Sequence, residues 1–280
     1  MNRRRLLALL VAVAAGSGPL AAQVPSDLAR ERSDFATWLR TAGVSPLRAL
    51  TQQAIGPGLT VGPPGSDIPL EGVGATQLLQ DRSGPVVLVG GGNRRPVPGN
   101  RAVALGDYQL VVAGLPGRQV ATFYGRTPKS VKLPTHFDYR PAWRQIVTLD
   151  PVTVPSAVPL LGSDGVEAQA TEAGRVQVTV GAQTVRLRVF RFPTGAEESE
   201  LEIYFRDGTN GSGSYPAGRF VSLVPTGDGR YVLDFNRARN PFCAYSTVYP
   251  CPAPWRGNTV PAAVDAGERY AGGGQSAPPI

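Results

Sequence analysis

Residues 176–190, which read VQVTVGAQTVRLRVF, indicate the fold more clearly than any other stretch of the sequence. In Val176–Val180 and Val185–Phe190, apolar residues alternate with polar ones, and valine is frequent. A period of two with β-branched and aromatic residues is typical of strands that bury one face. The stretch therefore predicts β-strands rather than a helix.

The same pattern recurs through most of the chain. Five further runs are rich in β-branched and aromatic residues, namely Val86–Val89, Tyr108–Val112, Leu201–Phe205, Phe220–Val224 and Tyr231–Phe235. The 34 glycines and 27 prolines interrupt the chain so often that long helices have little room. We therefore expect an all-β protein, a mostly antiparallel sandwich or barrel.

One helix is predicted ahead of the strands, within residues 23–45. Ser26 offers a capping oxygen at its start and Gly43 supplies its end. One face is apolar, with Leu28, Phe35, Trp38 and Leu39. The helix should therefore pack on the sheets.

Prolines divide the remaining chain. Pro151, Pro155 and Pro159 interrupt the pattern before a new series of strands begins. This interruption predicts a first β subdomain over residues 46–155 and a second over 156–270. Residues 271–280 contain Gly, Ser and Pro without large apolar side chains until the last position, which is typical of a disordered tail.

The first residues predict export. Arg3, Arg4 and Arg5 precede an uncharged apolar run, Leu6–Ala15, and small residues follow up to Ala22. This order is typical of a secretory signal peptide, and the run is too short to span a bilayer, which needs about 20 apolar residues. We expect residues 1–22 to be removed, leaving a periplasmic or extracellular protein with no transmembrane anchor.

Charge and composition exclude several function classes. Loss of the signal peptide lowers the formal charge from +7 to +4, because it removes three arginines and no acidic residue. The mature protein is then only mildly basic, so a nucleic-acid partner is not indicated. A single histidine and two cysteines are too few for a usual zinc site. No nucleotide, dinucleotide or serine-hydrolase fingerprint is present, and we expect no cofactor and no metal.

The candidate site lies in the last third of the chain, where polar residues are dense. Different predicted strands and turns contribute the candidate ligand-binding residues Asp207, Thr209, Tyr215, Arg219, Asp234, Asn236, Asn240 and Glu268. Buried charges must pair or bind something, so folding can bring some of these side chains into one polar site. Alternatively, the acids pair with arginines and cap turns, and the motif is a scaffold.

Cys243 and Cys251 are predicted to form a disulfide, because only seven residues separate them in a chain bound for an oxidising compartment. Closing this short loop would contribute about 2 to 3 kcal/mol by the chain-entropy model.

Several motifs of residues 204–270 match one known pattern: F-x-D-x-T-x-G, D-F-N-x-A-x-N-P-x-C-A-Y, C-P-x-P and A-G-E. The chain has F-R-D-G-T-N-G from Phe205 and D-F-N-R-A-R-N-P-F-C-A-Y from Asp234. In these motifs the sequence resembles a bacterial and archaeal family known as domain-of-unknown-function family 1684. Arg239 stands where the family usually has an aromatic residue. The resemblance implies no reaction, because the family has none assigned.

The residues leave binding and catalysis both open. We expect a non-catalytic binding or scaffold role in the envelope, with a polar or anionic ligand such as a glycan fragment gripped by amide and aromatic side chains. The alternative is a hydrolase acting on an envelope glycan, with two carboxylates from Asp207, Asp234 and Glu268 as acid and base. Carboxylates of this kind could also hold Ca²⁺.

Overall fold

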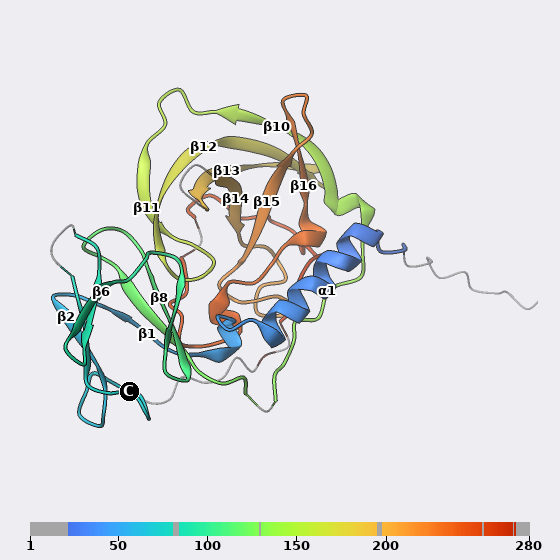
Figure 1. The fold of residues 1–280 in the computed structure, drawn as a ribbon. Helices are drawn as coiled ribbons and strands as arrows, with labels where there is room; N and C mark the ends of the chain where they lie inside the picture. The colour runs from blue at the N-terminus through green and yellow to red at the C-terminus, as the bar shows by residue number, and fades with distance from the viewer. Residues whose placement is uncertain are drawn as a thin grey trace, which may run out of the picture.

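The computed structural model describes residues 22–80, 84–128, 130–194, 198–253, 255–270 and 272. Figure 1 shows one long helix, a group of strands from the N-terminal half and a larger curved sheet from the C-terminal half. This arrangement confirms the predicted all-β fold with one N-terminal helix. The predicted signal peptide lies outside the described residues apart from Ala22, and the predicted tail lies outside them apart from Gly272.

The helix α1 runs Ser26–Thr41. Ser26 is its first helical residue rather than its cap, which corrects the prediction: Pro25 is the cap residue, and its carbonyl accepts a hydrogen bond from the Ala29 N–H. Thr41 ends the helix two residues before Gly43.

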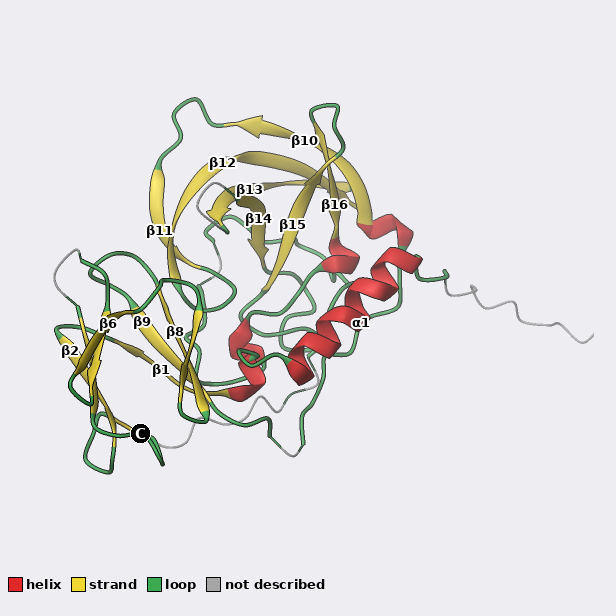
Figure 2. Ribbon diagram, viewed as in Figure 1, coloured by secondary structure: helices red, strands yellow, loops and turns green. Residues whose placement is uncertain are grey.

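The buried face of α1 packs on the C-terminal part of the chain, beside the short helices and loops there (Figure 2). The Phe35 ring lies edge-on to Tyr245, and the Trp38 ring contacts Phe242. Arg237 bridges Asp27 and Glu31 of the helix. Four short 3-10 helices complete the helical content of the described residues: η1 Pro46–Arg48, η2 Pro141–Trp143, η3 Phe235–Arg237 and η4 Phe242–Ala244.

Two sheets of the N-terminal half share one hydrophobic core. The first has the order β1-β9-β8-β7, with β1 Ala49–Ala54, β7 Ala102–Leu105, β8 Tyr108–Ala113 and β9 Val120–Tyr124. The second has the order β3-β2-β4-β5-β6, with β2 Gly58–Gly62, β3 Ile68–Pro69, β4 Thr76–Leu79, β5 Val87–Gly90 and β6 Asn93–Pro96. Val61 and Leu78 of the second sheet are fully buried together with Leu110 and Phe123 of the first.

The C-terminal half forms a sheet that closes on itself as a barrel. Its order is β10-β16-β15-β14-β13-β12-β11, and β12 also pairs with β10. The strands are β10 Arg144–Pro151, β11 Ala157–Leu161, β12 Glu167–Val180, β13 Gln183–Pro193, β14 Ser199–Phe205, β15 Arg219–Pro225 and β16 Arg230–Asp234. All neighbours are antiparallel. The alternating aliphatic residues of the predicted strands fill the interior, among them Val176, Val178, Leu187, Ile203 and Leu233.

Closure of the barrel depends on a close backbone approach at Gly174. A bulge between Glu172 and Gly174 transfers β12 from its first neighbour, β11, to its second, β10. A Cβ atom at Gly174 would lie 2.3 Å from the Asp150 carbonyl oxygen, and its φ of 155° is one that other residues rarely adopt. Only glycine fits this seam without separating the two strands.

The change from one sheet system to the next lies between β9 and β10. Because β10 pairs with β16 and β12, the predicted division at residue 155 falls among strands that are hydrogen-bonded to one another. Among the described residues, no helix has the length and apolar character that a membrane span requires.

Candidate functional site

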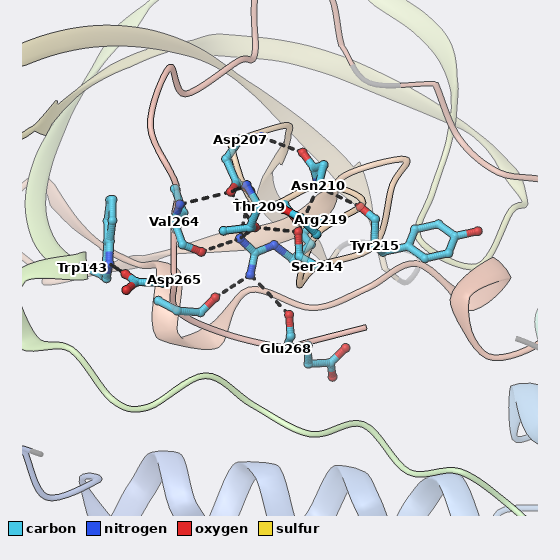
Figure 3. Close-up of polar contacts among 12 residues, drawn as sticks. Trp143, Asp207, Thr209, Asn210, Ser214, Tyr215, Arg219, Val264, Asp265 and Glu268 are labelled. Carbon is cyan, nitrogen blue, oxygen red and sulfur yellow. Dashed lines mark hydrogen bonds and ion pairs between the residues drawn. The ribbon is translucent and has the colours of Figure 1, made fainter. Parts of the chain in front are cut away.

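A buried ion pair lies at the centre of the polar residues (Figure 3). Asp207 follows the end of β14 and Arg219 begins β15, beside Phe205 in the register of the two strands. The Arg219 Nη2 atom lies 2.9 Å from Asp207 Oδ2, and neither side chain is exposed to solvent. Burial lowers the pKa of Arg219, and the Asp207 carboxylate opposes that shift.

Arg219 also holds the C-terminal segment against the barrel. Its guanidinium donates to three backbone carbonyls, those of Val264 at 2.8 Å, Ala266 at 2.5 Å and Glu268 at 3.3 Å. Asp207 contributes to the same join, because its Oδ1 accepts from the Val264 N–H at 3.1 Å. The pair is therefore a structural connection between the barrel and the C-terminal segment, although the buried Nε of Arg219 has no partner among the described residues.

The turn between β14 and β15 completes this network. Thr209 donates to Asp207 Oδ1 through its backbone N–H at 2.8 Å and its hydroxyl at 2.6 Å. The hydroxyl also lies 2.7 Å from Ser214 Oγ. The Tyr215 ring points away from Arg219 in Figure 3, and its hydroxyl lies 3.2 Å from Cys251 Sγ.

Asp234 and Asn236 have a separate structural role. Asp234 Oδ1 caps η3 by accepting from the Asn236 backbone at 3.0 Å and side-chain amide at 2.8 Å. The Asn236 amide also exchanges two hydrogen bonds with the backbone of Arg140, at 3.0 and 2.9 Å. Through these hydrogen bonds the two residues fix loops, and neither lines the cavity of about 450 Å³ described below.

Glu268 is buried and only partly hydrogen-bonded. Its Oε2 accepts from the Asn240 backbone N–H at 2.8 Å and from the Tyr245 hydroxyl at 2.5 Å, whereas its Oε1 has no partner among the described residues. Burial raises the pKa of Glu268 to about 7, and the two hydrogen bonds only partly offset that shift. The Asn240 side-chain oxygen is also buried without a partner in the described structure.

A cavity of about 450 Å³ lies beside Asn240 and Tyr245. We call it the C-terminal cavity. Its described walls come from η1, from Pro128 and residues 130–135, and from the C-terminal motif. They comprise Leu47, Pro128, Ser130, Val131, Lys132, Leu133, Pro134, Thr135, Asn240, Ala244, Tyr245, Arg269, Tyr270 and Gly272. Apolar side chains predominate, Lys132 and Arg269 add positive charge, and no carboxylate belongs to the described lining.

A second, much smaller cavity of about 20 Å³ lies on the α1 side of Glu268. Arg32 and His136 line it together with Glu268. Burial and the nearby Arg32 charge lower the pKa of His136 to about 4, so the imidazole is neutral at physiological pH.

Seven of the eight predicted site residues separate into three groups, and Tyr215 lies apart from them, beside Cys251. Asp207, Thr209 and Arg219 form the buried network, and Asp234 with Asn236 caps η3. Asn240 lines the C-terminal cavity, with Glu268 directly behind it. Sequence reasoning missed the segment of Val131, Lys132 and Leu133, where two apolar residues flank a cation, and it missed Arg269.

The two cysteines are free in the structure, unlike the predicted disulfide. Cys243 is buried and Cys251 is exposed. Burial and the neighbouring Cys251 raise the pKa of the Cys243 thiol to about 12, although a hydrogen bond with Tyr215 opposes this. The two thiols and the Tyr215 hydroxyl thus share one small cluster. Within the part of the chain that the structure describes, no group of three or more potential metal ligands occurs.

Comparison with known proteins gives a family but no activity. No curated protein matches the chain. An uncharacterised protein of Haloarcula marismortui, solved by NMR in solution, is 33% identical over 49% of this chain and 76% of its own, with a TM-score of 0.43. Residues 132–269, which include the buried network and part of the lining of the C-terminal cavity, match the family model described as "Protein of unknown function (DUF1684)". The chain therefore belongs to the DUF1684 family.

Proposed function

We propose that the chain is an exported, non-catalytic binding protein whose ligand occupies the C-terminal cavity. The cavity itself carries this proposal, because about 450 Å³ lies within the usual range of small-molecule sites, roughly 300 to 1,000 Å³. Two residues of the C-terminal motif with incomplete hydrogen bonding are found at this cavity. Asn240 lines it, and Glu268 lies directly behind Asn240.

The lining favours a polar or anionic ligand. Lys132 and Arg269 are exposed cations at the cavity, and Asn240, Thr135 and Ser130 add polar groups. The Tyr245 ring and the apolar residues among 130–135 offer faces for the uncharged part of a ligand. A few polar groups on a mostly apolar wall are typical of binding sites that orient a small molecule.

A hydrolase acting on an envelope glycan is the second candidate. The pKa of Glu268, near 7, suits a general acid. Such an enzyme needs two carboxyls facing one cavity at roughly 5 to 10 Å. Asp207 is paired with Arg219 and Asp234 caps η3, so neither supports the second role. Release of reducing sugar from envelope glycans, lost in Glu268→Gln, would favour catalysis over binding.

A thermal-shift screen tests the binding role. Envelope glycan fragments and small organic anions would be added to residues 23–280, and a ligand of the cavity should raise the melting temperature. Lys132→Glu should abolish that rise, whereas Arg94→Glu on the exposed strand β6 should leave it unchanged. No shift with any compound, or equal shifts in both variants, would contradict the proposal.

Export and the disulfide are part of the same proposal. The three arginines and the apolar run Leu6–Ala15 support a signal peptide, and the cluster of the two thiols with the Tyr215 hydroxyl supports pairing of Cys243 with Cys251. Protein isolated from the periplasm should begin near residue 23 and contain no free thiol. Two titratable thiols in that material would contradict the disulfide between Cys243 and Cys251.

A further inference from the structure

Glu268 lies one hydrogen bond behind the wall of the C-terminal cavity. Tyr245 and Asn240 both line the cavity, and both donate to the same carboxylate oxygen of Glu268. Figure 3 shows the Glu268 carboxylate turned away from the Arg219 guanidinium, which contacts only its backbone carbonyl. The charge of Glu268 is therefore close to the cavity, and no direct ion pair neutralises it among the described residues.

Among Glu268 and the titratable groups around it, Glu268 is the one with a pKa near neutral pH. Burial and the Glu268 charge raise the pKa of Tyr245 well above 10, and His136 has a pKa of about 4. Arg32, Arg219 and Arg239 also face Glu268 and remain cationic, because arginine does not lose its proton in proteins at such pH values. Between pH 6 and 8, only Glu268 in this group changes its charge.

We propose that the C-terminal cavity binds an organic anion with an apolar portion, and that Glu268 takes up one proton when this anion binds. The inference rests on the proposed binding function and adds the ligand class and its regulation. Lys132 and Arg269 attract the anionic group, and the apolar wall accepts the remainder. A negative charge in the cavity disfavours a second negative charge at Glu268. Binding of the anion therefore favours protonation of Glu268, and an ionised Glu268 weakens binding of the anion.

The proton has a defined place. Oε2 already accepts two hydrogen bonds, so the proton from solvent goes to Oε1, the oxygen without a partner. The small cavity beside Arg32 and His136 has room for about one water, which can accept a hydrogen bond from the protonated carboxyl. No co-reactant is needed, because solvent supplies the proton.

The sign of the pH dependence follows from the raised pKa. Below about pH 7 Glu268 is mostly protonated and neutral, so an anion binds without repulsion. Above pH 7 the carboxylate is ionised, and binding must either restore the proton or tolerate the repulsion. Affinity for the anion should therefore fall as pH rises from 6 to 8, by about fivefold if binding raises the pKa of Glu268 by one unit.

Matched probes and a matched variant test this coupling. Octanoate is the anionic probe and octanamide is its neutral counterpart of the same shape. Dissociation constants would be measured at pH 6 and pH 8 by ¹H–¹⁵N NMR titration, followed at the amides of Lys132 and Ala244 in the cavity wall. Wild type should bind octanoate about fivefold more weakly at pH 8 than at pH 6, whereas octanamide should show no such change. Glu268→Gln should bind octanoate equally at both pH values.

The outcomes separate this inference from the proposed function. Octanoate binding that is independent of pH in wild type, or equally dependent on pH in Glu268→Gln, would overturn the coupling. If octanamide binds with the same affinity as octanoate, the cavity does not select an anion, and that part of the proposal is wrong. If neither probe perturbs the cavity amides while another compound of the thermal-shift screen binds there, the ligand class is wrong and the binding role remains. If Glu268→Gln does not fold, the wild-type comparison of the two probes still decides.

Discussion

Replacing Arg219 with alanine should cost a large part of the folding free energy. The change leaves the Asp207 carboxylate buried without its cation, which typically costs 3 to 5 kcal/mol, since breaking a buried pair uncovers a charge. It also removes donors from the carbonyls of Val264, Ala266 and Glu268. We therefore expect a loss of at least about 4 kcal/mol, against a usual domain stability of roughly 5 to 15 kcal/mol.

Urea unfolding of residues 23–280, followed by circular dichroism, measures this loss, and a double-mutant cycle identifies its source. Asp207→Ala together with Arg219→Ala leaves no uncompensated charge, so the double variant should be more stable than the sum of the single losses implies, by about 2 kcal/mol. Arg126→Ala is the control, because Arg126 and Asp107 form an exposed pair, and stability should not change within error. Additive losses, or a loss below about 1 kcal/mol for Arg219→Ala, would refute the structural role of the pair.

Further predictions concern titration and backbone strain. Because the pKa of Glu268 is raised to about 7 in the folded state, stability should fall as pH rises from 5 to 7, and Glu268→Gln should reduce that slope in urea titrations. The C2 proton of His136, the sole histidine, should keep its neutral NMR shift down to about pH 5 in wild type, and Arg32→Ala should raise its pKa. Gly267→Ala should lower the melting temperature far more than Gly257→Ala, although both have positive φ, because only the Cβ at 267 would meet carbonyl oxygens, at 2.7 Å. Equal shifts in the two glycine variants would show that strain alone accounts for the loss.

The sequence predicts the strands well because their local pattern matches their burial. Val176–Val180 and Val185–Phe190 lie in β12 and β13, where alternate residues fill the barrel. The strand β10 escaped prediction because its residues are mostly exposed and its pairing partners, β12 and β16, lie far along the chain. Local periodicity carries no information about such distant pairing.

The candidate site was harder to predict, because residue type does not distinguish a buried structural pair from an open ligand site. Arg219 and Lys132 are both cations, yet one is fully enclosed and the other lines a cavity. Arg32 gave one usable signal: it lies four residues after Leu28, on the buried face of α1, where a charged residue needs a partner. The cavity itself results from tertiary packing of η1 and residues 130–135 against the C-terminal motif.

The seam at Gly174 sets where the barrel is weakest. Only Leu149, Asp150 and Pro151 of β10 pair with β12, and one of these, proline, has no N–H to donate. The neighbouring β12–β13 ladder extends from Thr171 to Val180. In native-state hydrogen exchange, the amides of the seam should therefore exchange through a local opening well before those of β13, so that the barrel opens along one line while its remaining strands stay paired.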